Sequence, residues 1–478
     1  MQNSQQFFIN GQWTDPVEPK TLAVVNPATE QAICDISLGS KADVDKAVVA
    51  AKHALPHWAK TTVENRIAIL QQAMKVYLEK GEALAQTISA EMGAPIALAR
   101  QAQVGSAFLH LKVATKLLEK FCFEQDNGNY RVHKEPIGVC GLITPWNWPA
   151  NQIMCKLAPA LATGCTVILK PSEMAPLNAI LIAKVFEEAG LPNGVFNLLN
   201  GDGQGVGIAM SQHPDIDMIS FTGSTRAGIA VAESAAASVK RVTQELGGKS
   251  ANIILPDANL EKAVAKGVYE CMSNSGQTCL APTRMLVPDE LHEQAVRIAK
   301  TTAEKLIVGD PNDENTFMGP LAHAAQYSKV TNIIRNAIEQ GSELVCGGPD
   351  RPKGLDKGYY VKPTIFCNVS NEMMIAREEI FGPVLCIMPY KDEAEAIAIA
   401  NDSPYGLAGY VQSENEEHAL NIARHLETGY VLVNGGILDF NAPLAGHKQS
   451  GNGAEWGEAG FDDYLSLKSV VGIATGKK

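Results

Sequence analysis

The sequence predicts an α/β fold built on two parallel β-sheets. Apolar runs of the length of buried strands recur in the middle of the chain, at residues 137–144, 165–170, 195–199 and 218–222. Stretches with helical periodicity lie between them, at residues 151–162 and 177–189. Strands that alternate with helices of this length indicate βαβ units and a parallel sheet. A second run of the same kind extends from about residue 252 to about residue 434, so we expect a second sheet there.

The chain before the first sheet is expected to be mostly helical. Ser40 is suited to cap a helix, and further helical periodicity follows at residues 64–79, 82–92 and 96–120. Residues 121–135 alternate around Asn127-Gly128, a pair typical of a β-hairpin turn. This hairpin is either an assembly element or an ordinary surface hairpin. Residues 464–473 are predicted to form a last strand.

Composition excludes several classes of protein. A length of 478 residues suggests about three domains, and 46% hydrophobic residues are enough for a packed core, which excludes wholesale disorder. The 40 Lys and Arg against 52 Asp and Glu give a net charge of −12. A nucleic-acid partner is not expected, because phosphate binding needs a basic footprint.

The cysteines and the N-terminus predict a cytoplasmic protein. None of the ten cysteines is spaced as C-x-x-C, which favours reduced thiols over disulfides. The start of the chain lacks the basic and apolar regions of a signal peptide, and no stretch is typical of a membrane span, so no membrane partner is expected. His53 and His57 have the spacing of a zinc pair but lack the neighbouring Glu of H-E-x-x-H, so no metal site is expected.

Two segments at predicted strand ends are suited to nucleotide binding. Lys170 and Glu173 follow a strand, where ammonium and carboxylate groups can hydrogen-bond ribose hydroxyls. Gly223 belongs to a short loop that is expected to start a helix at about Thr225, whose backbone N–H groups can bind phosphate. The glycines of residues 201–207 do not fit G-x-G-x-x-G, and we interpret that segment as a flexible loop.

Cys279 is the thiol with the strongest case for a chemical role. It lies in a locally uncharged segment with Gly and Ser, NSGQTCLAP, that is expected to be a loop. A free thiol is only a few per cent thiolate at neutral pH, so a nucleophilic cysteine needs activation. Glu245 precedes two glycines and is a candidate general base, provided that the fold brings it near the thiol.

Taken together, the motifs resemble those of the NAD(P)-dependent aldehyde dehydrogenases over essentially the whole chain. They are TPWNWP (144–149), KPSE (170–173), FTGS (221–224), ELGGKS (245–250), GQTC (276–279), EEIFGPV (378–384) and KQSG (448–451). The resemblance implies two Rossmann-like parallel-sheet domains, one for the cofactor and one for catalysis, plus a small β oligomerisation element. By position, the cofactor domain comprises residues 1–120 and 136–247, and the catalytic domain comprises residues 248–435. The oligomerisation element comprises residues 121–135 and 461–478, and residues 436–460 return to the active site.

The resemblance also implies catalytic roles. Cys279 resembles the nucleophile that attacks the aldehyde carbonyl, and Asn147 resembles the side-chain donor of the oxyanion hole. Glu245 resembles the general base that activates water to release the acid. Glu455 matches a second carboxylate that relays protons, although a solvated loop Glu would look the same in the sequence.

For the cofactor, the resemblance assigns contacts along the whole dinucleotide. Lys170 and Glu173 resemble the adenosine-ribose contacts, Gly223 and Ser224 the pyrophosphate contacts, and Glu379 and Phe381 the groups that hold the nicotinamide riboside. The other implied contacts are Thr144, Pro145 and Trp146. A carboxylate at the ribose 2′-hydroxyl would repel a 2′-phosphate, so Glu173 favours NAD, with NADP as the alternative.

Several readings of the activity compete. The main one is NAD-dependent oxidation of an aldehyde to a carboxylic acid by a homodimer or homotetramer. The others are acyl transfer to coenzyme A, thiol esterase activity and a non-catalytic scaffold. The motif before KQSG is commonly PFGG but reads PLAG here, at residues 443–446, so an aromatic that often lines the substrate entrance is missing.

Overall fold

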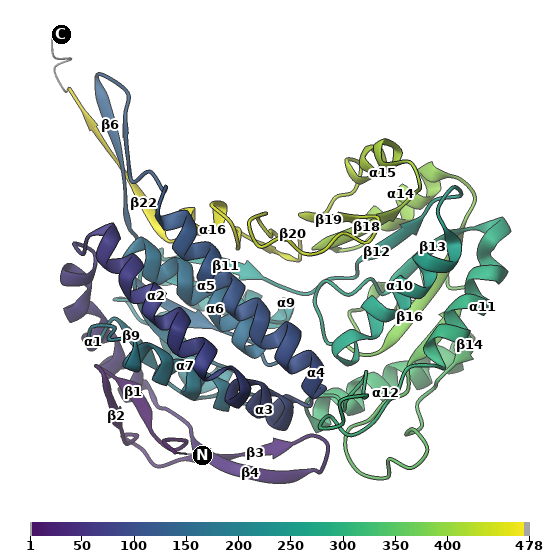
Figure 1. Cartoon of the computed structure of the whole chain (residues 1–478), viewed down its shortest axis with the longest axis horizontal. Helices are drawn as coiled ribbons and strands as arrows, with labels where there is room; N and C mark the ends of the chain where they lie inside the picture. The colour runs from purple at the N-terminus through teal and green to yellow at the C-terminus, as the bar shows by residue number, and fades with distance from the viewer. Residues whose placement is uncertain (1, 473–478) are drawn as a thin grey trace.

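The computed structural model describes residues 2–472 and shows two α/β lobes joined side by side (Figure 1). The first lobe is built on an eight-stranded sheet with the order β2-β1-β9-β8-β7-β10-β11-β21. Its strands are β1 (Phe7–Ile9), β2 (Gln12–Thr14), β7 (Val139–Ile143), β8 (Thr166–Lys170), β9 (Phe196–Leu198), β10 (Met218–Thr222), β11 (Arg241–Glu245) and β21 (Gly451–Asn452). The five central strands, β9 to β11, are parallel as predicted, whereas β1 and β21 join them antiparallel.

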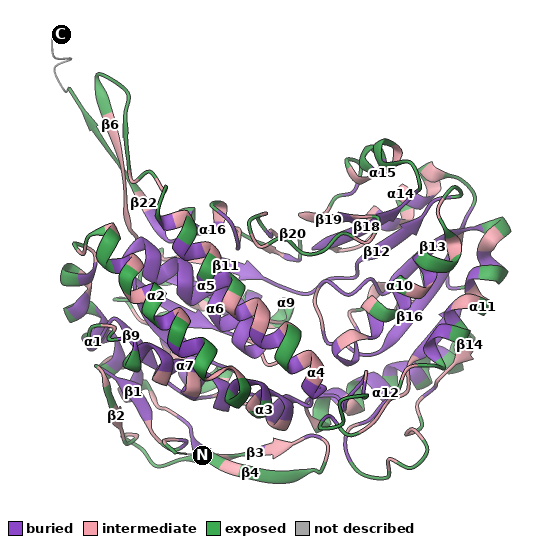
Figure 2. Ribbon diagram, viewed as in Figure 1, coloured by how far each residue is buried: buried purple, intermediate pink, exposed green. Residues whose placement is uncertain are grey.

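The second lobe is built on a seven-stranded sheet with the order β14-β15-β16-β13-β12-β18-β19. Its strands are β12 (Ala251–Ile254), β13 (Arg284–Pro288), β14 (Glu343–Cys346), β15 (Thr364–Cys367), β16 (Val384–Tyr390), β18 (Ala408–Gln412) and β19 (Tyr430–Val433). All pairs are parallel except β14 with β15. The central strands are buried on both faces (Figure 2) because helices cover them, as is usual for parallel sheets. The prediction of two parallel-sheet lobes is confirmed.

The helices of the first lobe follow the predicted periodicity closely. They are α1 (Lys41–Trp58), α2 (Val63–Glu79), α3 (Gly81–Met92), α4 (Ile96–Leu98), α5 (Val104–Leu118), α6 (Pro149–Thr163), α7 (Leu177–Glu188), α8 (Ile208–Gln212) and α9 (Thr225–Ala235). Ser40 caps α1 in a capping box with Asp43, as its sequence position predicted.

Two local predictions are wrong in an informative way. The single helix expected over residues 96–120 is interrupted by a π-helical turn, Ala99–Gln103, between α4 and α5. Such turns are often found at functional sites. The segment interpreted as a flexible loop, residues 201–207, is instead mostly helical: Asp202 caps the turn Gly203–Gly207, which runs directly into α8. The Asp202 side chain accepts from the backbone N–H of Gly205, a local bond that composition alone did not reveal.

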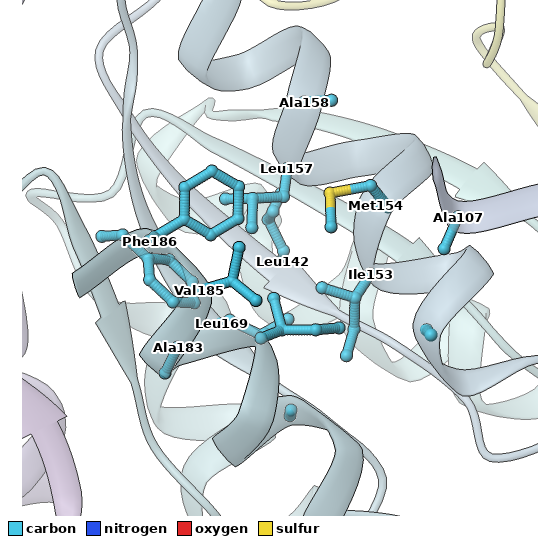
Figure 3. Close-up of a cluster of buried hydrophobic side chains, with 14 of the residues drawn as sticks. Ala107, Leu142, Ile153, Met154, Leu157, Ala158, Leu169, Ala183, Val185 and Phe186 are labelled. Atoms are coloured by element: carbon cyan, nitrogen blue, oxygen red, sulfur yellow. The ribbon is translucent and has the colours of Figure 1, made fainter. Parts of the chain in front are cut away.

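Helix α6 is the central element of the core of the first lobe. Every one of its residues is buried, and it packs between the sheet and α5. Figure 3 shows Ile153, Met154 and Leu157 of α6 among Leu142, Leu169 and Phe186, which come from β7, β8 and α7. A helix that is apolar on all sides is expected to be fully buried. Lys156 is the one charged residue of this helix, and a buried charge needs a partner.

The second lobe has helices on both faces of its sheet and shorter elements around it. The helices are α10 (Leu260–Met272), α11 (His292–Ala303), α12 (Ala324–Glu339), α13 (Met374–Arg377), α14 (Glu393–Asn401) and α15 (Glu416–Ala423). A short turn of 3-10 helix is Asp289–Leu291, the turn Ser273–Gly276 contains left-handed residues, and the first lobe has a further 3-10 turn at Ala236–Ser238. Two further strand pairs are β3 (Thr21–Asn26) with β4 (Gln31–Ser37) and β17 (Tyr405–Gly406) with β20 (His447–Lys448).

A small three-stranded sheet projects from the first lobe (Figure 1). The predicted hairpin consists of β5 (Glu124–Asp126) and β6 (Tyr130–Pro136), and β22 (Leu465–Val471) pairs antiparallel with β6 after the short helix α16 (Ala459–Asp462). The last residue of the predicted strand, Ile473, lies outside the described residues, as do residues 474–478 of the predicted oligomerisation element. Leu467 and Val471 are exposed apolar side chains on β22. That this sheet mediates assembly stays a prediction.

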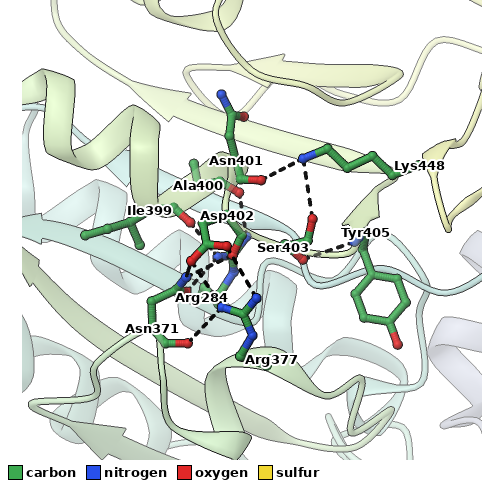
Figure 4. A network of polar contacts seen from close by, with 10 residues as sticks. All are labelled: Arg284, Asn371, Arg377, Ile399, Ala400, Asn401, Asp402, Ser403, Tyr405 and Lys448. Carbon is green, nitrogen blue, oxygen red and sulfur yellow. Dashed lines mark hydrogen bonds and ion pairs between the residues drawn. The ribbon is translucent and has the colours of Figure 1, made fainter.

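A polar network fixes the loops of the second lobe against β13 (Figure 4). The fully buried guanidinium of Arg284 donates to the carbonyl oxygens of Lys249, Ile399 and Ala400 at 2.8–2.9 Å. Lys448 donates to the carbonyl oxygen of Asn401 at 2.6 Å, so the returning segment is tied to the same corner. These bonds fix both segments that flank Glu245, the stretch after β11 and the motif KQSG.

Within residues 2–472 the structure has no helix that combines the length and the apolar character needed to cross a membrane.

Candidate active site

The candidate site lies where the parallel strands of the first sheet end. Thr222 and Glu245 are paired neighbours at the ends of β10 and β11, and residues 144–149 follow the end of β7. In an open α/β sheet, ligands bind outside the carboxyl ends of the strands. The second lobe closes this edge with the segment of Cys279 and with residues 378–382.

A cavity of about 230 Å³ opens at this edge. Its walls include many of the residues predicted from the sequence: Pro145, Trp146, Asn147, Gly223, Ser224, Cys279, Glu379 and Phe381. These residues come from both lobes, and in the sequence they extend from position 145 to position 381. The other lining residues, which sequence reasoning did not single out, are Thr222, Leu246, Gly247, Gln326 and Lys329.

The loop that carries Cys279 has an unusual backbone. Asn274, Ser275 and Gly276 all have positive φ, at 53°, 57° and 71°. A Cβ on Gly276 would lie 2.1 Å from the carbonyl oxygen of Gly382, so only glycine fits there. Runs of left-handed residues cost free energy and persist where the surroundings hold them, often at functional sites. The Ser275 hydroxyl, which donates to the Gly319 carbonyl at 2.8 Å, is one such restraint.

Asn147 is tied to this loop from both of its ends. Its side-chain Nδ2 donates to the carbonyl oxygen of Gln277 at 3.0 Å, which leaves the second amide hydrogen free for a ligand. Its backbone oxygen accepts from Asn274 Nδ2 at 2.8 Å and from Gln103 Nε2 at 3.1 Å. Gln103 is the last residue of the π-helical turn, and it is fully buried. The interruption of the predicted helix therefore supports the site.

Cys279 as a residue is half-buried, and its thiol lies near several carboxyl groups. Burial raises its pKa to about 12, with further contributions from the charges of Glu245, Glu379 and Glu455, while the backbone N–H of Leu280 opposes them. The thiol is therefore protonated at neutral pH in the structure, and its activation requires that its proton move to a neighbouring base.

Glu245 is a buried carboxylate at the end of β11. Burial raises its pKa well above the ordinary value, and the charge of Glu455 adds to this, while Lys156 opposes it. Neither carboxylate oxygen has a hydrogen-bond partner of good geometry among the described residues, although the backbone N–H of Gly446 lies near enough to oppose the rise of the pKa. A buried carboxyl group with so few partners is suited to exchange a proton, because bonds hold neither protonation state firmly.

Glu455 is not a solvated loop residue. It is buried, it forms an ion pair with the fully buried Lys156 of α6, and it lies 3.3 Å from the Cys155 thiol. Burial lowers the pKa of Lys156, but the charges of Glu455 and Cys155 outweigh it and the pKa is raised. Lys156 was missed by sequence reasoning, although a lone lysine in an apolar helix was a usable signal. Glu455, Lys156 and Glu245 form one electrostatically coupled group.

Lys170 and Glu173 lie at the far end of the same strand edge. The buried Lys170 Nζ donates to Gly201 O at 2.8 Å and to Glu173 Oε2 at 3.3 Å, so the ammonium orients the carboxylate. Burial lowers the pKa of His323, and the charge of Glu173 opposes this shift. The His323 ring contacts Trp146 edge to face at 5.1 Å. Thr144, which the sequence placed among the cofactor contacts, is buried beside Lys170 and does not line the cavity.

Glu379 and Phe381 are held by α12, an element whose role was not predicted. Lys329 Nζ donates to Glu379 O at 2.9 Å, and Gln326 Nε2 donates to Phe381 O at 2.8 Å. Glu379 Oε1 accepts from the backbone N–H of Gly248 at 3.0 Å, three residues after Glu245. Phe381 has a φ of +59° and contacts Trp146 edge to face at 5.4 Å.

Ser224 is the N-cap of α9, and its hydroxyl accepts from the backbone N–H of Ala227 at 3.3 Å. Gly223 and Ser224, which directly precede this helix, line the cavity, so the helix begins at the cavity wall. That its first N–H groups bind the pyrophosphate stays a prediction. Among residues 2–472, no cluster of three or more His, Cys, Asp or Glu side chains is arranged to hold a metal ion.

Comparisons with known proteins agree with this geometry. The model of the aldehyde dehydrogenase family matches residues 13–470. The chain is 52% identical to a 3-succinoylsemialdehyde-pyridine dehydrogenase from Pseudomonas sp., over 99% of both proteins.

Solved structures show the same fold. A cysteine-to-alanine variant of aldehyde dehydrogenase C from Pseudomonas syringae, in complex with NAD⁺ and octanal, is 50% identical with a TM-score of 0.99, covering 100% of this chain and 98% of that one. A Mycobacterium tuberculosis aldehyde dehydrogenase in complex with NAD⁺ is 38% identical with a TM-score of 0.96, covering 99% of each chain. The chain described here belongs to the aldehyde dehydrogenase family and is an aldehyde-oxidising enzyme.

Proposed function

We propose that the enzyme oxidises an aldehyde to a carboxylic acid with NAD, using Cys279 as nucleophile, Asn147 as oxyanion donor and Glu245 as general base. The observation that carries the proposal is the position of Cys279. Cys279 lines the cavity at the strand ends, and Asn147 is bonded to its loop. The charge of Glu245, a buried carboxylate without a hydrogen-bond partner of good geometry, raises the pKa of the Cys279 thiol.

The cavity fits the nicotinamide end of a dinucleotide. Trp146 and Phe381 offer apolar ring surface, Glu379 offers a carboxylate for ribose hydroxyls, and the start of α9 offers N–H groups for the pyrophosphate. The buried hydroxyl of Thr222 in the cavity wall has no hydrogen-bond partner among the described residues, as expected of a group that bonds a ligand. NAD complexes of the two structural relatives support this choice of cofactor.

Each of these residues has a defined role in the proposed reaction. The proton of the Cys279 thiol moves to Glu245, and the sulfur adds to the aldehyde carbon to form a thiohemiacetal, whose oxyanion Asn147 Nδ2 stabilises. The bound dinucleotide supplies the hydride acceptor for oxidation to the thioester. Glu245 then loses the thiol proton, and the pair of Lys156 and Glu455 is placed to exchange it. The carboxylate next takes a proton from water, which attacks the thioester; the acid leaves, and Glu245 gives that proton to the departing sulfur to restore the thiol.

Glu245 also separates this proposal from acyl transfer to coenzyme A, because a buried base beside the thioester favours attack by water. An esterase without redox chemistry would leave the cavity residues Glu379 and Phe381 without a purpose, and a scaffold would not need the strained loop at Cys279.

The deciding experiment is NADH formation by the purified protein over a panel of aldehydes, with and without coenzyme A. Signal that depends on an aldehyde but not on coenzyme A supports the proposal. Signal that appears only with coenzyme A would contradict it.

Replacement of Asn147 by alanine is expected to lower kcat about 100- to 1,000-fold, because one oxyanion donor is lost. The measurement is steady-state NADH formation, with NAD affinity measured separately. Asn151→Ala, on the same buried helix start but bonded to His110, is the matched control for a structural effect. Equal losses in the two variants would remove Asn147 from the oxyanion role.

Replacement of Glu173 by glutamine is expected to increase kcat/KM for NADP relative to NAD about tenfold or more, because a 2′-phosphate then meets Lys170 without a repelling carboxylate. The ratio of kcat/KM for the two cofactors is the quantity to measure. An unchanged ratio would show that Glu173 does not face the adenosine ribose.

We further propose that the enzyme works as a homodimer or homotetramer held together through the sheet of β5, β6 and β22. The exposed apolar side chains of β22 and its free strand edge support this, since an edge strand can extend a neighbour's sheet. Light scattering on the intact chain measures the mass, and a monomer would contradict the proposal.

The ten free cysteines support a reducing compartment such as the cytoplasm.

A further inference from the structure

A buried network of side-chain amides joins the proposed oxyanion donor to the loop of the nucleophile. Its members are Gln103, Asn147, Asn274 and Gln277, each of which is at most 3% exposed. Buried amides need hydrogen-bond partners, and away from water each such bond fixes the groups that it joins more firmly. None of the four side chains carries a charge, so the network acts through geometry.

Gln103 is bonded to both sides of this network. Its Nε2 donates to the backbone oxygen of Asn147 at 3.1 Å and to Oδ1 of Asn274 at 3.4 Å. Because Oδ1 of Asn274 accepts from Gln103, Nδ2 of Asn274 is turned toward Asn147, and it donates to the same backbone oxygen at 2.8 Å. Gln103 therefore bonds Asn147 directly and also sets the direction of the second amide that bonds it.

These two donors hold a part of the chain that is irregular. Residues 144–148 lie between the end of β7 and the start of α6. The direction of the Asn147 side chain depends on its backbone, which the two bonds to its carbonyl oxygen fix, and on the bond from Nδ2 to Gln277 O at 3.0 Å. The second hydrogen of Nδ2, which is the one proposed to stabilise the oxyanion, takes its direction from the same three bonds.

The π-helical turn that carries Gln103, Ala99–Gln103, lies where the two lobes meet (Figure 1). Gln103 continues the buried face of α5, whereas Arg100 lies on the outer side of the turn. Arg100 is ion-paired with Glu82 of the first lobe at 2.8 Å and with Glu314 of the second lobe. The outer side of the turn is thus anchored to both lobes, and its inner side reaches the oxyanion donor.

We propose that Gln103 is a positioning residue for the oxyanion donor. Together with Asn274 it holds the carbonyl of Asn147, and through it the free hydrogen of Nδ2, in the direction that the reacting oxygen requires. The inference rests on the proposed function, since it requires an oxyanion at Asn147. It adds a residue that is not among those lining the cavity, so it acts without contact to substrate or cofactor.

The test compares a reaction that forms an oxyanion with one that does not. The first is the first turnover of NADH formation, measured by stopped flow with an aldehyde that the unmodified enzyme oxidises. The second is alkylation of Cys279 by iodoacetamide, followed by mass spectrometry, in which the sulfur displaces iodide and no carbonyl oxygen gains charge. Gln103→Met keeps the volume of the side chain and removes the donor. It is expected to slow the first turnover about tenfold, and to leave the alkylation rate and the affinity for NAD unchanged.

A double-mutant cycle shows whether Gln103 acts through Asn147. If it does, adding Gln103→Met to Asn147→Ala slows the first turnover no further, because the donor that Gln103 positions is already absent. A second variant, Asn274→Gly, keeps the left-handed backbone at that residue and removes the other donor to the same carbonyl. It is expected to show the same selective loss, and it decides the question if Gln103→Met does not fold.

The matched control is Gln412→Met, which removes a buried amide that donates to Asn252 Oδ1 at 3.0 Å, at the end of β18. It is expected to change neither rate. The inference is overturned by an unchanged first turnover in both variants, by equal slowing of the alkylation, or by losses that multiply in the double variant. These results leave the proposed function intact as long as Asn147→Ala is itself slow. Full activity of Asn147→Ala would instead reject the oxyanion role in the proposed function, and the inference with it.

Discussion

Replacing Cys279 by alanine is expected to abolish aldehyde-dependent NADH formation, with a loss in kcat of at least about 10⁴-fold. The reason is that the variant cannot form the thiohemiacetal from which the substrate is oxidised, and the neighbouring thiols cannot substitute for it. Cys155 is buried against Glu455, and Cys271 is buried with a pKa raised to about 12. The measurement is NADH absorbance with a substrate that the unmodified enzyme oxidises.

The same variant is expected to bind NAD with unchanged affinity, because Cys279 contributes only one side chain to the wall of the cofactor cavity. Titration calorimetry measures this. Cys346→Ala, which removes a half-buried thiol from β14 in the second lobe, is the matched control and should retain full activity. Oxidation that persists in Cys279→Ala would exclude Cys279 as the nucleophile.

Replacing Glu245 by glutamine is expected to slow hydrolysis of the thioester about 100- to 10,000-fold, because the water then lacks its base. Because the thiol also loses its proton to Glu245, the burst of up to one equivalent of NADH per active site should itself slow, but less than the steady state that follows it. Stopped-flow absorbance separates the two phases. Glu233→Gln, at an exposed position of α9, is the control and should show no such change. A normal steady-state rate in Glu245→Gln would rule out Glu245 as the base.

The Glu245 variant also tests the electrostatics of the thiol. The charge of Glu245 raises the pKa of Cys279, so its removal is expected to lower that pKa. The rate of alkylation of Cys279 by iodoacetamide follows the thiolate fraction, and its rise with pH should therefore shift to lower pH. A shift to higher pH would show that Glu245 stabilises the thiolate instead.

The sequence predicts those parts of the site that lie at the ends of recognisable strands. Lys170 and Thr222 each close a predicted apolar run, and the carboxyl ends of parallel strands meet at one edge, so their positions at one edge follow from elementary topology. Glu245 joins them at the end of β11, whose sequence RVTQE is not apolar and did not predict a strand. The position of Cys279 beside them does not follow from topology, because it depends on how the second lobe docks. Only the resemblance to a family anticipated that contact.

What the sequence could not predict are contacts between distant buried charges. Lys156 and Glu455 are paired across 299 residues, and spacing contains no information about such a pair. A buried lysine needs a partner of opposite charge, so the sequence shows that Lys156 must have one but does not show that it is Glu455. Gln103 is similar: helical periodicity runs through it, and its bond to Asn147 O at the end of the π-helical turn is a contact with a distant residue that periodicity does not reveal.

The segment between β19 and β22 joins tasks that are usually assigned to separate parts of an enzyme. It contributes Phe440 and Trp456 to the apolar cluster against which Cys279 packs, pairs Gly451 with the backbone of Glu245, and then continues into the projecting strand β22. The projecting sheet and the catalytic base are therefore parts of one continuous stretch of chain. In the proposed assembly through β22, dilution that separates the subunits is expected to loosen the stretch of chain that positions Glu245.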